Sequence, residues 1–191
     1  MGADSQFSTL EAQIRECYAR AAWTHKTHEK CADLLNRRLN NYKWWQIGLS
    51  ALVTTGVLIT IFGRVNLIII LSSVLSLLLT VLNTYLKQYD LGGEAQKHAD
   101  AATAVWNIRE SYLSLLTDMH SSNIKIEQAI EKRDSLQNEL LSIYKNAPRT
   151  FKKAYKESTK ALKALDELTF SDEEIDKLLP PPLKKCVMTN K

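Results

Sequence analysis

Hydrophobic residues follow two different patterns along the chain. Residues 44–86 are almost continuously apolar, and Arg64 is their one charged residue. On both sides of this stretch, apolar positions recur every three or four residues among charged ones, which is the spacing of an amphipathic helix. The pattern predicts an all-α membrane protein in which an apolar helical hairpin continues into charged helices.

The apolar stretch divides into two segments of membrane-spanning length, residues 44–63 and 65–86. Twenty helical residues rise about 30 Å, the thickness of a bilayer's hydrocarbon core. Only a short turn around Arg64 separates the segments, so the second helix has to run back beside the first, with the Arg64 side chain reaching the lipid headgroups. We expect a two-span transmembrane hairpin.

Basic residues predict how the hairpin is oriented. Lysines and arginines cluster before the first span and after the second, whereas the turn has only Arg64. The positive-inside rule therefore places both termini in the cytoplasm. Aromatic residues at the same two ends predict a membrane-interface belt: Tyr42, Trp44, Trp45 and Tyr85.

A few polar residues interrupt the spans, and nearly all of them fall in the cytoplasmic half. The candidates among them for a pore lining or for contacts between the spans are Gln46, Ser50, Thr54, Ser73, Ser76, Thr80 and Asn83. One interpretation pairs them across the hairpin by hydrogen bonds, for example Ser50 with Thr80 and Thr54 with Ser76. The other has them line a polar path, which requires a homo-oligomer because one hairpin cannot enclose a pore. The sequence leaves both open.

The flanking segments predict an antiparallel helix pair in the cytoplasm. Residues 1–43 and 87–120 both repeat apolar positions in steps of three and four, as in a coiled coil. Continuing the hairpin's register places Ala32 opposite His98. Gly92 and Gly93 interrupt the second repeat and are candidates for a hinge between the membrane and cytoplasmic parts.

The rest of the chain predicts a helical region over residues 121–179 and a flexible tail over residues 180–191. We expect one helix over residues 124–146, a second from Pro148 to about residue 168, and a short third helix capped by Ser171 and Glu174. The second helix is strongly basic. Its candidate contacts to lipid or to a phosphate-bearing ligand are Arg149, Lys152, Lys153, Lys156 and Lys160, although a solvated helix face has the same pattern.

Composition and motifs limit the kinds of binding and catalysis that we expect of this chain. Three cysteines do not suit a disulfide-stapled secreted domain, and a net charge of +4 gives no reason to expect direct nucleic-acid binding. His25, His28 and Cys31 lie three residues apart, but without a second ligand cluster they do not predict a metal site. No phosphate-binding glycine loop or nucleophile motif is present, so we expect no catalytic residues, no cofactor and no enzyme activity.

Several segments resemble one known family in both sequence and order. They are residues 15–28 (RECYARAAWTHKTH), 89–92 (YDLG), 95–102 (AQKHADAA), 106–110 (WNIRE) and 170–176 (FSDEEID). Their order around the hairpin resembles the SLATT domains, the SMODS and SLOG-associating two-transmembrane effector domains. The chain is most similar to the type linked to reverse-transcriptase conflict systems.

The resemblance implies an effector of bacterial antiphage or conflict systems that assembles in the inner membrane and disrupts it. It implies no catalytic residues, and it suggests a separate sensor or nucleotide-generating partner protein. We therefore expect a homo-oligomer that permeabilises the membrane when triggered. The alternative is a membrane-anchored coiled-coil scaffold that recruits a cytoplasmic partner without forming a pore.

Overall fold

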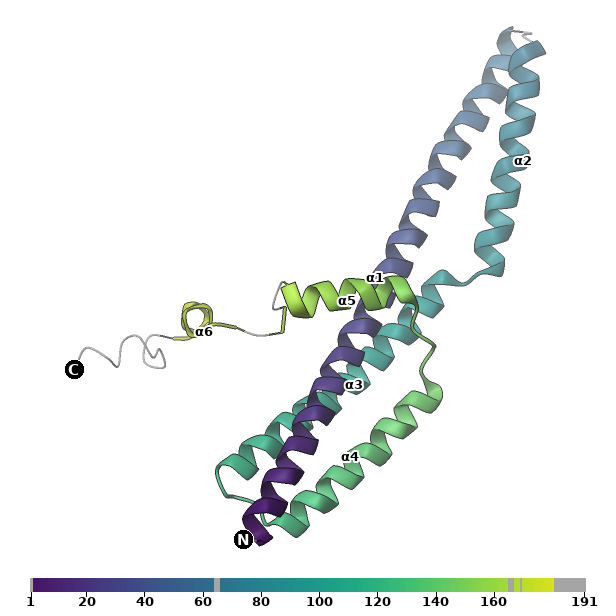
Figure 1. Ribbon diagram of the computed structural model, residues 1–191. Helices are drawn as coiled ribbons and strands as arrows, with labels where there is room; N and C mark the ends of the chain where they lie inside the picture. Colours follow the sequence, from purple (N-terminus) through teal and green to yellow (C-terminus); the bar gives the residue numbers. More distant parts are fainter. Residues whose placement is uncertain (1, 64–65, 165–166, 169, 181–191) are drawn as a thin grey trace.

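The computed structural model describes residues 2–63, 66–164, 167–168 and 170–180, and within them every regular element is an α-helix (Figure 1). This confirms the predicted all-α class. The helices are α1 (Gly2–Gly63), α2 (Asn66–Gln88), α3 (Leu91–His120), α4 (Ile126–Asn146), α5 (Lys152–Ala164) and α6 (Asp172–Leu178).

Helix α1 is a single rod that joins the two halves of the molecule. Its 62 residues contain no proline and, at 1.5 Å per residue, extend about 93 Å. Helix α2 runs antiparallel beside its C-terminal half and α3 beside its N-terminal half (Figure 1). The rod therefore connects the apolar hairpin directly to the bundle that α1 forms with α3 and α4.

The hairpin of α1 and α2 supplies two helices that are long and apolar enough to cross a membrane, as predicted. Large apolar side chains cover its outside instead of filling an interior. Trp44 is 72% exposed, Leu67 65% and Leu77 66%. Such a surface is what hydrocarbon, or another copy of the hairpin, would cover.

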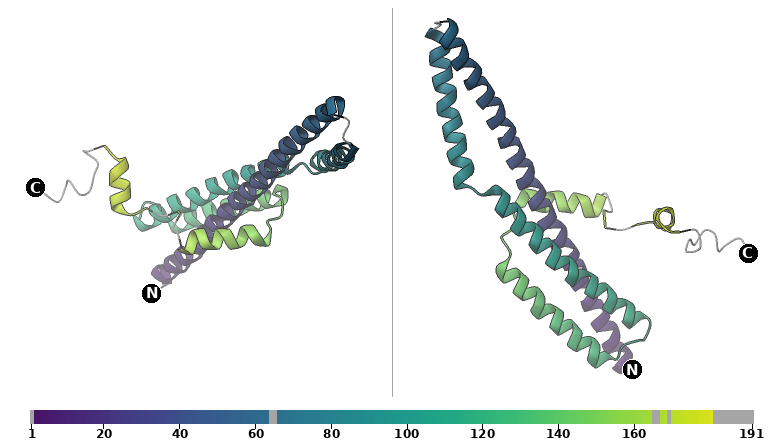
Figure 2. Two further views of the ribbon diagram at one scale, coloured as in Figure 1. Left: turned by 90° about the horizontal axis from the view of Figure 1, so that it is seen from above. Right: turned by 180° about the vertical axis from the view of Figure 1, so that it is seen from behind.

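The core of the bundle lies between α1, α3 and α4. Its fully buried side chains include Ile14, Val105, Ile108 and Tyr112. Helix α3 buries two faces: one follows the predicted repeat against α1, and the other, with Ile108 and Leu115, joins the cluster that α4 completes. The second face was not predicted, because two overlapping stripes on one helix blur the periodic pattern. Figure 2 shows α4 alongside the pair.

The register of the α1–α3 pair differs from the prediction by about one helical turn. His28, not Ala32, lies opposite His98, with the two Nδ1 atoms 2.9 Å apart. His25 lies opposite Ala102, whose carbonyl oxygen is 3.0 Å from its Nδ1 atom. The physical reason is the break in the helix at Tyr89 and Asp90, since a register cannot be extrapolated through a segment that leaves the helix.

Gly92 and Gly93 lie just after that break, inside the first turn of α3. The carboxylate of Asp90 caps the helix by accepting a hydrogen bond of 2.8 Å from the backbone N–H of Gly93. A β-carbon at position 93 would overlap this carboxylate, so the cap requires glycine there. The predicted hinge role of the two glycines stays a prediction.

Helix α5 crosses α1 through a face of small residues: Ala154, Ser158 and Ala161. It begins at Lys152 and not at Pro148, which corrects the predicted start. Ala147 is extended, with ψ of 142°, because a residue that precedes proline is disfavoured in the α conformation. Residues 181–191, all but the first residue of the predicted tail (180–191), lie outside the described residues.

Candidate functional site

Most of the polar residues predicted in the spans lie on the outside of the hairpin. Ser73, Ser76, Thr80 and Asn83 are all exposed on α2, and Thr54 is exposed on α1. Gln46 and Ser50 are half-buried, on the side of α1 that faces α2. The structure therefore places the α2 polar stripe, defined here as Ser73, Ser76, Thr80 and Asn83, away from α1.

The predicted hydrogen bonds between the spans are not formed by these side chains in the described part of the chain. Instead the hydroxyls donate to carbonyl oxygens of their own helix: Thr54 to Ser50, Ser73 to Ile69 and Thr80 to Ser76, each at 2.9 Å. The prediction that Ser50 pairs with Thr80 and Thr54 with Ser76 is therefore wrong for this hairpin. Whether the α2 polar stripe lines a path stays a prediction.

Helix α2 is rotated in this way because Ser72, and not Ser73, faces α1. Ser72 is only 8% exposed and packs against Gly56, which is buried. A β-carbon at position 56 would overlap the Ser72 hydroxyl and lie 3.2 Å from the Ser72 Cβ, so any larger residue would make the hydroxyl turn away and the helices move apart. Close packing of small residues is how helices associate in lipid, where burial of apolar surface gives no driving force between them.

Aromatic rings mark the end of the hairpin nearest the bundle. Tyr42 and Tyr85 meet edge to face with centroids 5.5 Å apart, and Tyr89 continues the stack at 4.7 Å from Tyr85. Trp44 and Trp45 are exposed beside them. This arrangement fits the predicted interface belt. Arg64, predicted at the opposite end, lies outside the described residues.

Two histidines occupy the centre of the α1–α3 contact. His28 and His98 are each 3% exposed, and the edge of the Phe151 ring meets His98 at 6.3 Å between centroids. Burial lowers the pKa of His28 to about 4, assisted by the neighbouring His98, and burial also lowers the pKa of His98. Both rings are therefore neutral at pH 7, so one Nδ1 donates and the other accepts.

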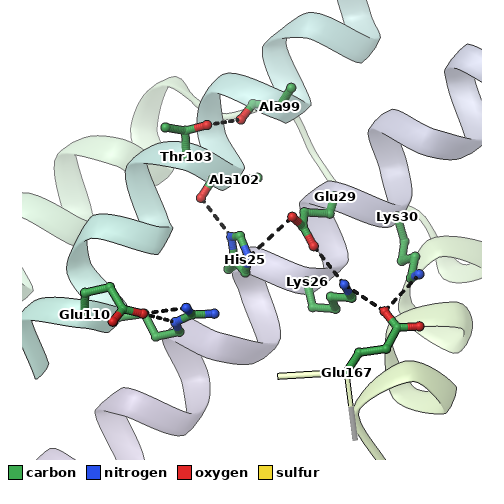
Figure 3. A network of polar contacts seen from close by, with 10 residues as sticks. His25, Lys26, Glu29, Lys30, Ala99, Ala102, Thr103, Glu110 and Glu167 are labelled. Carbon is green, nitrogen blue, oxygen red and sulfur yellow. Dashed lines mark hydrogen bonds and ion pairs between the residues drawn. The ribbon is translucent and has the colours of Figure 1, made fainter. Parts of the chain in front are cut away.

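A chain of polar contacts that begins at His25 ties α1 to α3 and to the segment after α5 (Figure 3). His25 contacts α3 through the Ala102 carbonyl and lies 3.5 Å from Glu29. Lys26 bridges Glu29 at 2.9 Å and Glu167 at 2.8 Å, and Lys30 contacts Glu167 at 3.3 Å. The hydrogen bond from Lys26 holds the pKa of Glu167 below its usual value. The network fastens the segment after α5 to α1.

The predicted basic contacts lie on or just before α5. Arg149, Lys152, Lys153, Lys156 and Lys160 are all exposed. The opposite face of α5 is fixed on α1, where Thr27 and Ser158 exchange a hydrogen bond of 2.9 Å and Tyr155 lies 6.0 Å from Trp23 between ring centroids. The cations therefore lie on an anchored helix or, for Arg149, just before it, and all of them are accessible.

Comparison with known proteins settles the family. The model of SMODS and SLOG-associating 2TM effector domain family 4 matches residues 10–174, most of the chain. The chain belongs to the SLATT family. The matched range covers both candidate spans and the helices outside them through Glu174, so the two-transmembrane description agrees with the hairpin. No curated protein and no solved structure matches the chain.

Two features of this SLATT domain were not predicted from its sequence. The Gly56–Ser72 contact could have been found as a pair of small residues at equivalent depths in the two spans. The Thr27–Ser158 contact joins residues far apart in the chain, and no local pattern marks it. Among the described residues, no group of three His, Cys, Asp or Glu side chains is placed to hold a metal ion.

The buried histidine pair makes the stability of this SLATT domain depend on pH. Unfolded histidines titrate near pH 6.5, whereas His28 in the folded protein titrates near pH 4, so the unfolded chain binds more protons between these values. Stability is therefore complete above about pH 6.5 and declines as the pH falls toward 4. We expect a loss of about 2 kcal/mol, after allowance for solvent screening.

Thermal unfolding of the detergent-solubilised chain, followed by circular dichroism across this pH range, measures the effect. His28→Gln should flatten the dependence, and His120→Gln, which changes an exposed histidine at the end of α3, should leave it unchanged. Equal pH dependence in all three proteins would contradict the prediction.

Proposed function

We propose that this SLATT protein is a membrane effector of a bacterial antiphage or conflict system, of the type linked to reverse transcriptases. In this proposal it lies in the inner membrane with both termini in the cytoplasm, oligomerises, and permeabilises or depolarises the membrane when triggered. The observation that carries the proposal is the outward direction of the α2 polar stripe.

The energetic argument separates the members of the stripe. Ser73 and Thr80 donate to their own backbone, so their hydroxyls can face lipid at little cost. The amide of Asn83 has two N–H donors and a carbonyl, and it lies about 3 Å along α2 from Tyr85 of the interface belt, so exposure to lipid costs it a fraction of the roughly 4–8 kcal/mol that transfer to cyclohexane would cost. Contact with water or with another copy removes that cost. A ring of hairpins whose α2 polar stripes face its centre would supply both water and contact with neighbouring copies.

The cytoplasmic helices are suited to control such an assembly. Helix α1 runs without interruption from the bundle into the hairpin, so a rearrangement around the buried histidines would be transmitted along the rod. The family's name associates it with SMODS and SLOG domains, which implies a partner system. We propose that the trigger comes from a separate sensor or nucleotide-generating partner protein.

Controlled expression in bacteria with a membrane-potential dye tests the proposal. We expect the wild-type chain, with its activating partner, to collapse the potential and stop growth. Thr80→Leu/Asn83→Leu should preserve both, because it removes the polar groups without shortening the span. The matched control Val74→Leu/Val81→Leu adds bulk to exposed positions of the same helix and should remain toxic.

Intact potential and growth with the wild-type chain and its partner would contradict the effector proposal and favour the scaffold, which recruits a partner without a pore. Undiminished toxicity of the inserted Thr80→Leu/Asn83→Leu variant would contradict the role of the stripe. Extraction of each variant from washed membranes confirms that it has inserted.

A further inference from the structure

A basic pocket lies where α5 meets α1, close to the aromatic belt. It has a volume of about 440 Å³ and is lined by Leu34, Leu35, Arg37, Arg38, Asn41, Phe151, Lys153 and Glu157. The residues come from two elements that are remote in sequence. Sequence analysis identified the cations of the α5 segment but did not connect them to those of α1.

Charge in the pocket favours an anion. Three cations, Arg37, Arg38 and Lys153, face a single carboxylate, Glu157. Arg38 is oriented by a hydrogen bond of 3.1 Å from its Nε atom to the Tyr42 hydroxyl, and its other guanidinium N–H groups donate to no side chain or carbonyl among the described residues. Guanidinium groups match the geometry of phosphate oxygens and bind them with charge-assisted hydrogen bonds.

The pocket lies at the depth of lipid headgroups. Arg37 precedes Trp44 by seven residues, which is about 10 Å along the helix, and Asn41 precedes it by about 5 Å. Tryptophan in such a belt sits at headgroup level, and the headgroup layer adds roughly 5–7 Å to each side of the hydrocarbon core. Side chains of arginine and lysine easily extend over the remaining distance.

The pocket also has an apolar side. Leu34, Leu35 and Phe151 line it together with the cations. A free phosphate ion would gain nothing from these side chains, whereas the glycerol and upper acyl carbons attached to a lipid phosphate would contact them. This combination favours a lipid over a soluble phosphate compound.

We propose that the pocket between Arg37, Arg38, Asn41 and Lys153 binds the headgroup phosphate of an anionic phospholipid in the cytoplasmic leaflet. The bound lipid links α5 to α1 at the membrane surface. This inference rests on the membrane location in the proposed function but not on pore formation.

Native mass spectrometry of the full chain in an uncharged detergent, titrated with phosphatidylglycerol or phosphatidylcholine, tests the site. One basic residue near an anionic surface contributes about 1 kcal/mol, which is roughly fivefold in affinity. Arg37→Gln/Lys153→Gln should therefore weaken phosphatidylglycerol binding by about 25-fold. Lys125→Gln/Lys132→Gln removes two exposed cations at the other end of the bundle and should change it less than about twofold.

Equal weakening by the two double variants, or equal affinity of the wild type for the two lipids, would overturn the proposal. Displacement of the lipid by excess inorganic phosphate would overturn it too, by making the pocket a soluble-phosphate site. Retention of each protein in carbonate-washed membranes is measured in parallel. Release of the wild type by that wash would contradict the membrane location itself, so the two failures are distinguishable.

Discussion

Replacing Gly56 with leucine should force the two spans of the hairpin apart. A β-carbon at this position would overlap the Ser72 hydroxyl and lie 3.2 Å from Ser72 Cβ, and the rest of the leucine has no space between the helices. Overpacking of a closely packed contact typically costs about 1–3 kcal/mol. The distance between the axes of two packed helices grows with side-chain size, from about 8 to about 10 Å. We therefore expect Gly56→Leu to increase this distance by about 2 Å.

Electron paramagnetic resonance between spin labels at Ile47→Cys and Val81→Cys measures this separation in a chain without its native cysteines. Gly48→Leu is the matched control, because a β-carbon at position 48 meets nothing within 4 Å. Gly56→Ala should also widen the distance, and Ser72→Gly added to it should restore the original value. An equal effect at positions 48 and 56, or no restoration, would contradict the proposed contact.

Tyr112→Ala should be among the most destabilising substitutions in the bundle of α1, α3 and α4. Tyr112 is fully buried in the core between α1, α3 and α4, and truncation of a buried aromatic side chain costs about 3–5 kcal/mol. Its hydroxyl is buried and forms no hydrogen bond of ordinary geometry among the described residues, and its nearest polar group is the Cys17 thiol, a weak partner. Removal of that hydroxyl alone relieves a desolvation cost, so Tyr112→Phe should be neutral or slightly stabilising.

Thermal unfolding of the bundle in detergent, monitored at 222 nm, compares the two Tyr112 variants with the wild type. The predicted order of melting temperatures places Tyr112→Ala far below the wild type and Tyr112→Phe at or above it. A Tyr112→Phe variant as unstable as Tyr112→Ala would mean that the hydroxyl is bonded and that the packing argument is wrong.

The sequence predicted the helical class and the two spans because long apolar runs and regular repeats are local properties. The α1 rod followed from the absence of proline and from a continuous repeat. The face of α2 that packs against α1 was harder to predict, because Ser72 and Ser73 are adjacent in the chain and chemically the same. Which of them faces α1 depends on where the partner helix has space, and Gly56 decides it.

The remaining differences come from contacts between distant segments. The α1–α3 register shifts at Asp90, where a capping residue starts a new helix. The pattern of apolar positions is the same before and after Asp90, so the sequence pattern does not reveal the shift. The basic pocket has a similar origin. Lys153 was among the predicted contacts to lipid or phosphate, but no sequence pattern links it to Arg37, and only the crossing of α5 over α1 brings the two side chains to one place.

The mass of the chain assembled in the membrane tests the central claim most directly. The chain is expressed together with its partner, and the cells are lysed once growth has stopped. The protein is then extracted in a mild detergent, and its molar mass is measured by light scattering. We expect an assembly of at least three chains. The Thr80→Leu/Asn83→Leu variant should form an assembly of fewer chains. A monomer or dimer would contradict it, because so few hairpins cannot enclose a polar path.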